Sequence, residues 1–248
     1  MIDVETLTRL KTMRLSGMVE YFENLAADTA TKAVLTGPEM VKLAVDCEFE
    51  RRKDSKLRRL RKNASFAQPN ADLADLKVMP GRSVDIELLA RLGVGSYLRL
   101  HQDVILQGPT GSGKTYVACA LGNRACQQHR SVLYLPASEL FDRLTIAERT
   151  NDKKRCLDTL VKNELLILDD WFLATPTREQ VRQLHTLIDR RHRTGSTIYC
   201  SQLPPEHWHE RVEEKILADS IIDRITTNAH TTVLNCQESM RKHFNQLK

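Results

Sequence analysis

Gly108-Pro109-Thr110-Gly111-Ser112-Gly113-Lys114-Thr115 is the stretch that decides the fold of this 248-residue chain. It has the spacing GxxxxGK[ST], in which glycines let backbone N–H groups converge on phosphate oxygens at the start of a helix. A short apolar strand, Val104–Gln107, precedes it, and a helical pattern runs from Tyr116 to about Gln128. This order predicts a site for ATP and Mg²⁺, with Lys114 on the β- and γ-phosphates and the Thr115 hydroxyl on the metal. A chance glycine-rich turn is the alternative.

A second motif lies downstream, at Leu165-Leu166-Ile167-Leu168-Asp169-Asp170. Four aliphatic residues predict a buried strand, which delivers its two terminal acids to the sheet edge where the phosphate loop also lies. We expect Asp169 to hold the Mg²⁺ shell and Asp170 to orient or polarise the attacking water. Two solvated acids at the end of a strand are the alternative interpretation of this motif by itself.

Five short apolar runs alternate with longer amphipathic segments after residue 81: Val104–Gln107, Val132–Leu135, Leu165–Leu168, Thr197–Cys200 and Thr232–Leu234. Such alternation is typical of a mostly parallel sheet covered by helices on both faces. We therefore predict an α/β domain over residues 82–248. The fourth run ends in Ser201 and Gln202, either of which could touch the γ-phosphate or the water, although a plain strand end is equally consistent.

The residues before the sheet have a different pattern. Apolar residues recur at helical spacing from Val4 to about Ala64, which predicts a helical domain over residues 1–67. Residues 68–81 lack clear periodicity and end in the turn signal Pro80-Gly81, so we place a linker there.

A cluster of eight cations and one acid lies within that helical region. On a helix, Arg51, Arg52, Arg58, Arg59 and Lys62 cover the side opposite a narrow apolar stripe, so their charges can line up along a phosphate backbone. The lack of aromatic residues favours backbone contacts over base stacking. A solvated helix face is the alternative. The predicted DNA-binding residues are Arg51, Arg52, Lys53, Lys56, Arg58, Arg59, Arg61 and Lys62.

Composition narrows the functional class further. The formal net charge of +5 is modest, and the six cysteines contain no CxxC pair, which favours reduced thiols over disulfides or zinc ligands. The sequence holds no apolar run of the length that a membrane span needs and no export signal. We expect a cytoplasmic protein with no membrane partner.

Taken together, these residues resemble the IstB-type helper ATPases of insertion-sequence transposition, within the AAA+ superfamily near the DnaC loaders and DnaA initiators. The more specific features are Ser201-Gln202-Leu203-Pro204, His207-Trp208-His209 and Glu238-Ser239-Met240-Arg241-Lys242. The resemblance covers most of the chain and implies a three-layer α/β/α domain. It further implies that Ser201 is the first sensor, Arg224 the arginine finger and Arg241 the second sensor; from spacing alone, both arginines could be surface residues.

Two positions depart from the family pattern. Phe172 stands where glycine is common, which bears on the shape of the loop after the acid pair, and Thr231 stands where a basic residue is common.

The resemblance implies a helper that assembles on duplex DNA with ATP, as a ring or helical oligomer in which Arg224 of one subunit completes the next site. It also implies recruitment and stimulation of a transposase and resetting by hydrolysis. A helicase loader, a small-molecule kinase and a nucleotide-gated binding module are the alternatives.

Overall fold

The computed structural model describes residues 3–28, 34–76, 82–236 and 239–240. The chain divides into two compact units, Met1–Arg59 and Leu60–Lys248. This division falls inside a helix, whereas the sequence analysis places the boundary after residue 67. The assignment of domains at residues 67 and 82 therefore stays a proposal.

The first unit is helical. It contains α1 (Val4–Thr12), α2 (Ser16–Ala27) and most of α4 (Gly37–Ala64). Gly17 lets the backbones of α2 and α4 approach closely, because a Cβ at Gly17 would lie 2.6 Å from the Cα of Glu48. The Glu48 carboxylate is buried and accepts hydrogen bonds from the Gly17 amide at 2.7 Å and from Arg52 Nε at 2.5 Å. This contact fixes α2 against α4.

The second unit is built on a five-stranded sheet in the order β3-β4-β5-β2-β6, with every neighbouring pair parallel. The fold class predicted from the sequence is therefore confirmed. The strands start and end within a few residues of the predicted runs: β2 (Asp103–Gln107), β3 (Val132–Pro136), β4 (Leu165–Asp169), β5 (Ser196–Ser201) and β6 (Ala229–Val233).

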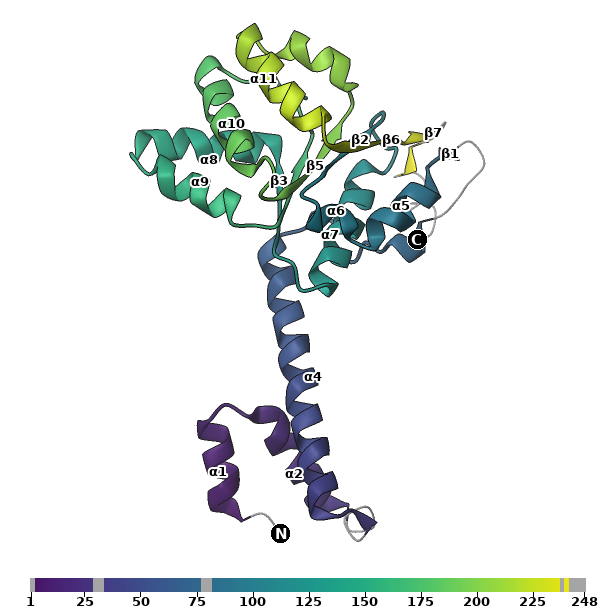
Figure 1. Ribbon diagram of the computed structural model, residues 1–248, viewed down its shortest axis with the longest axis vertical. Coiled ribbons are helices and arrows are strands. Elements are labelled where there is room, and N and C mark those ends of the chain that lie inside the picture. Colours follow the sequence, from purple (N-terminus) through teal and green to yellow (C-terminus); the bar gives the residue numbers. More distant parts are fainter. Residues whose placement is uncertain (1–2, 29–33, 77–81, 237–238, 241–248) are drawn as a thin grey trace. The chain divides into compact units, whose positions relative to one another are not determined.

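Helices cover both faces of this sheet, and β4 shows why a continuous apolar strand is needed. Leu166 and Leu168 belong to the core beneath one helical layer, while Ile167 faces Gly122 of the other layer. In Figure 1, α5, α6 and α7 lie on one side of the sheet and α8 to α11 on the other. Their bounds are α5 (Ile86–Gly93), α6 (Ser96–Arg99), α7 (Lys114–Gln127), α8 (Ala137–Arg149), α9 (Lys153–Val161), α10 (Arg178–Arg191) and α11 (Lys215–Thr226).

Smaller elements complete the second unit. β1 (Arg82–Ser83) pairs antiparallel with β7 (Asn235–Cys236), and two 3₁₀ helices are η1 (Leu73–Asp75) and η2 (Pro205–Arg211). Across the described parts of both units, no helix is both long and apolar enough to cross a bilayer.

Candidate active site

The glycine-rich loop connects β2 to α7, as its motif predicts. Gly108, Gly111 and Gly113 have φ values of +152°, +83° and +94°, a region that only glycine adopts without strain. The space around Gly108 is also closed, because a Cβ there would lie 2.1 Å from the carbonyl oxygen of Leu234. The loop therefore needs glycine at these positions both for its conformation and for its packing.

Lys114 is the first residue of α7, and its side chain lies within the loop. Its Nζ atom donates hydrogen bonds to the carbonyl oxygens of Gly108 at 2.7 Å and Pro109 at 3.0 Å, and the side chain is buried. Burial lowers the pKa of Lys114, while the Cys200 thiol and the Asp169 and Asp170 carboxylates act in the opposite direction. These acids help to keep the ammonium charged where triphosphate oxygens would bind.

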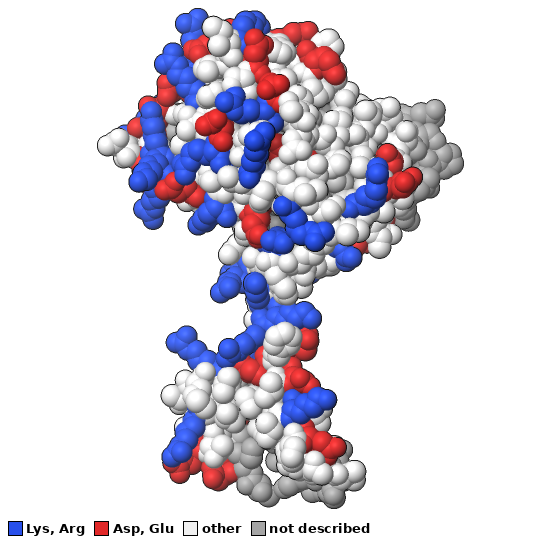
Figure 2. Space-filling model, in the orientation of Figure 1, with Lys and Arg blue, Asp and Glu red and all other residues white. Residues whose placement is uncertain are grey.

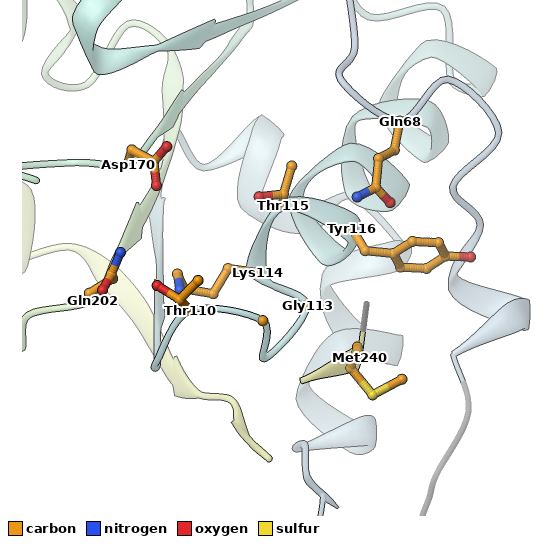
Figure 3. A pocket seen from close by; sticks show the side chains of 10 residues that line it. Gln68, Thr110, Gly113, Lys114, Thr115, Tyr116, Asp170, Gln202 and Met240 are labelled. Carbon is orange, nitrogen blue, oxygen red and sulfur yellow. The ribbon is translucent and has the colours of Figure 1, made fainter. Parts of the chain in front are cut away.

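A pocket opens beside the loop. Figure 3 shows Asp170 and Gln202 at one end of it, Gln68, Tyr116 and Met240 at the other, and the loop between them. We call the part of the pocket that Asp170 and Gln202 line, next to the loop, its phosphate end. The residues that line it are Gln68, Thr110, Gly111, Gly113, Lys114, Thr115, Tyr116, Asp170, Gln202 and Met240.

The two acids of the second motif have different surroundings. Asp169 ends β4 and is buried, and its Oδ2 atom accepts a hydrogen bond from the Thr115 hydroxyl at 2.7 Å. Asp170 is exposed, has a left-handed φ of 54° and lines the pocket. The oxygen donors of Thr115 and Asp169 are of the type that Mg²⁺ prefers, so these residues fit the metal that the sequence predicts. The structure thus brings together the phosphate loop and both predicted acids.

Ser201 and Gln202, the two candidates for contact with the γ-phosphate, have different surroundings at the end of β5. Ser201 is fully buried, and its Oγ atom donates to the Trp171 carbonyl at 3.2 Å while accepting from the Leu203 amide at 3.1 Å and from Trp208 Nε1 at 3.2 Å. Gln202 is exposed and lines the pocket. Ser201 therefore joins the turn after β4 to η2, and Gln202 is the residue that faces the phosphate end.

The predicted arginine finger lies on α11. Arg224 donates from Nη1 to the Ser220 carbonyl at 3.0 Å and also bonds the Ser220 hydroxyl, and its Nη2 atom is 3.1 Å from Asp189 Oδ1. Arg224 is not among the residues that line the pocket of its own chain. Arg241 lies outside the described residues. Its neighbour Met240 lines the pocket and donates its amide to the Gly111 carbonyl at 2.9 Å.

All eight cations of the basic cluster are exposed on α4, and Figure 2 shows Lys and Arg side chains gathered along this helix. Three of them are paired: Arg51 with Glu20, Arg52 with Glu48, and Lys53 with Glu50. Within the described residues no ion pair involves the others, which are Lys56, Arg58, Arg59, Arg61 and Lys62. The cations at residues 51–53 therefore form ion pairs, whereas those at residues 56–62 form none with the described residues.

Two contributors to the site, Tyr134 and Gln68, carry no motif and were missed in the sequence. Tyr134, on β3, donates a hydrogen bond to Asp169 at 2.8 Å. Gln68 lies in the predicted linker, yet this segment packs on α7: the Tyr116 hydroxyl bonds the backbone of Asp72, and the Asn123 amide donates to the carbonyls of Pro69 and Ala71 at 2.9 Å. The weak periodicity of residues 68–76 reflects a segment held by its backbone, which sequence patterns do not reveal.

Comparisons with known proteins agree with this geometry. The profile of the family described as IstB-like ATP binding protein matches residues 8–247. The insertion sequence IS1162 ATP-binding protein of Pseudomonas fluorescens is 40% identical over 204 residues, covering 82% of this chain and 88% of that protein. The insertion sequence ATP-binding protein y4pL of Sinorhizobium fredii is 36% identical over 239 residues, covering 96% of each.

Solved structures show the same fold at low identity. The crystal structure of DnaI has a TM-score of 0.58 at 21% identity and covers 72% of this chain and 94% of that one. DnaA from Aquifex aeolicus, bound to AMPPCP, has a TM-score of 0.60 at 16% identity and covers 73% of this chain and 54% of that one. Over about three quarters of its length, this chain is therefore similar in fold to these two proteins.

Proposed function

The chain belongs to the IstB-like ATP binding proteins of insertion sequences, and from that membership we propose that it is an ATP-hydrolysing, DNA-binding helper of transposition. One observation carries the enzymatic part: residues of the phosphate loop, among them Thr115, line one pocket together with Asp170, and the buried Asp169 bonds the Thr115 hydroxyl. In the proposed mechanism, Lys114 binds the β- and γ-phosphates, Thr115 and Asp169 hold Mg²⁺, and Asp170 orients the attacking water. Bound Mg²⁺ would neutralise the charge that develops on the phosphoryl group.

We assign the sensing of the γ-phosphate to Gln202 and a structural role to Ser201. The exposed amide of Gln202 faces the phosphate end of the pocket, whereas all hydrogen bonds of Ser201 are made inside the protein. The family resemblance gives the role of first sensor to Ser201. Our proposal gives this role to the next residue, Gln202. The predicted roles of Arg224 and Arg241 remain proposals.

The position of Arg224 supports assembly. An arginine finger must reach the phosphates, and Arg224 does not line its own pocket, so it would act on the pocket of a neighbouring subunit. A head-to-tail contact of this kind produces closed rings or helical filaments. ATP bound between two subunits would strengthen the contact, and hydrolysis would weaken it.

The unpaired cations of α4 support the nucleic-acid part of the proposal, in which the ligand is duplex DNA. The proposed protein partner is the transposase of the same element, and the proposed compartment is the cytoplasm. Contacts by Lys and Arg with phosphates carry no sequence information, so we expect weak sequence preference. A helicase loader would instead prefer single strands, and a small-molecule kinase would yield a phosphorylated product.

Sedimentation of the protein with duplex DNA and a non-hydrolysable ATP analogue tests this function. We expect large complexes that require both ligands, and loss of these complexes when Arg224 is replaced by alanine. A protein that remains monomeric under these conditions, or that assembles only on single strands, would contradict the proposal.

A further inference from the structure

Tyr134 lies on β3, two positions before Pro136, the residue that pairs with Asp169 of β4. In the parallel register of β3 and β4, Tyr134 pairs with Ile167 and Pro136 with Asp169. Since side chains two residues apart share a face of a sheet, the side chain of Asp169 lies on the same face as that of Ile167. A tyrosine is long enough to bridge the diagonal between neighbouring strands, which is about 7–8 Å.

The hydroxyl of Tyr134 uses this position to bond the Asp169 carboxylate. Oδ2 of Asp169 accepts from Tyr134 at 2.8 Å and from Thr115 at 2.7 Å, and Oδ1 accepts from the Asp170 amide at 3.0 Å. A carboxylate offers about four acceptor positions, so these three bonds take most of them. They fix the rotation of the carboxylate and limit the direction in which its remaining acceptor position points, which is the position that would serve a bound Mg²⁺.

Tyr134 is suited to be a permanent donor in this arrangement. Tyr134 is 7% exposed, and the ionised carboxylate of Asp169 can only accept a hydrogen bond, so the Tyr134 hydroxyl is the donor. A buried tyrosine needs a hydrogen-bond partner in any case, so the experiment must separate a metal-related role from a purely structural one.

We propose that Tyr134 is a positioning residue for the metal: its hydroxyl holds the Asp169 carboxylate in the orientation that serves Mg²⁺ beside Thr115. The proposal rests on the assigned role of Asp169 at the metal. Groups that hydrogen-bond a metal-ligating side chain and fix its orientation typically contribute 10- to 100-fold to metal affinity.

Tyr134→Phe removes the hydroxyl and retains the ring, so it tests this role directly. We measure binding of Mn²⁺, as a stand-in for Mg²⁺, by electron paramagnetic resonance in the presence of ADP, and ADP affinity in EDTA. We expect the Mn²⁺ dissociation constant to rise about 10-fold, with ADP affinity in EDTA unchanged. Tyr97→Phe is the matched control, because the buried Tyr97 hydroxyl has no hydrogen-bond partner among the described residues.

The double variant with Asp169→Asn completes the test. If Tyr134 acts through Asp169, then Tyr134→Phe causes little further loss of Mn²⁺ affinity in the Asp169→Asn background. Unchanged Mn²⁺ affinity in Tyr134→Phe, or a loss of ADP affinity that is equal with and without metal, overturns the proposal. Failure of the wild-type protein with ADP to bind Mn²⁺ would instead overturn the assignment of the metal site.

Discussion

Replacement of Phe172 by glycine and by alanine tests how the turn after the acid pair is stabilised. Phe172 has a left-handed φ of 55°, which explains why glycine is the residue expected there. Its ring is nevertheless buried, 4.5 Å from the ring of Trp171 and 5.8 Å from that of Trp208 between centroids. The chain therefore accepts backbone strain at this position in exchange for an aromatic contact.

The two effects have different magnitudes. The left-handed conformation costs a non-glycine residue roughly 1–2 kcal/mol, whereas the loss of a buried phenylalanine ring costs about 3–5 kcal/mol. Phe172→Gly relieves the first and suffers the second, so we expect a net destabilisation of about 1–4 kcal/mol. Phe172→Ala loses the ring and retains the strain. The glycine variant should therefore be more stable than the alanine variant by about 1 kcal/mol, the reverse of the usual order.

Urea unfolding followed by tryptophan fluorescence measures this difference. Both tryptophans of the chain, Trp171 and Trp208, are in the aromatic cluster, so the signal reports the second unit directly. The reasoning is refuted if the alanine variant is as stable as the glycine variant, since strain at Phe172 would then be absent. It is also refuted if either variant is as stable as wild type.

Three further predictions concern other parts of the molecule. Ser201→Ala leaves the Leu203 amide without its partner, so thermal unfolding should show a loss of stability of about 1–3 kcal/mol, with ATP affinity retained. Gln202→Ala should instead keep the stability of the protein and slow ATP hydrolysis about 100-fold, as measured by phosphate release. Burial raises the pKa of Asp103 to about 7, against an unfolded value near 3.8, so between these values the folded protein binds a proton that the unfolded chain has lost. The free energy of unfolding should therefore fall by up to about 1.4 kcal/mol per pH unit from about pH 5 to 7. Unfolding curves of Asp103→Asn should lack this dependence on pH. If the five unpaired cations of α4 each contact a phosphate, a plot of the logarithm of DNA affinity against the logarithm of salt concentration should have a slope of about −4.5. Arg58→Ala should reduce the size of this slope by about 1. Arg51→Ala should reduce it less, because the guanidinium of Arg51 already pairs with Glu20.

The sheet and the phosphate loop could be predicted because their signals are local. Four aliphatic residues before Asp169 identify a buried strand. The glycines from Gly108 to Gly113 identify a loop with positive φ values, which glycine adopts without strain. The parallel topology then requires both motifs to meet at one edge.

The contributions of Tyr134, Ser201 and Gln68 could not be predicted in the same way. Tyr134 reaches Asp169 only through the register of two strands that are distant in sequence. Ser201 and Gln202 are equivalent by spacing, and the packing of Trp208 against the end of β5 decides which of them is buried. Gln68 joins the pocket because side chains of α7 bond the backbone next to it.

Titration of the purified protein with ATP by calorimetry, in Mg²⁺ and in EDTA, is the most direct test of the proposed metal–triphosphate site. We predict tight binding in Mg²⁺ that weakens in EDTA, is lost in Lys114→Ala and persists in Asp170→Asn, which should slow hydrolysis only. Equal affinity of wild type and Lys114→Ala for ATP in Mg²⁺ would contradict the account.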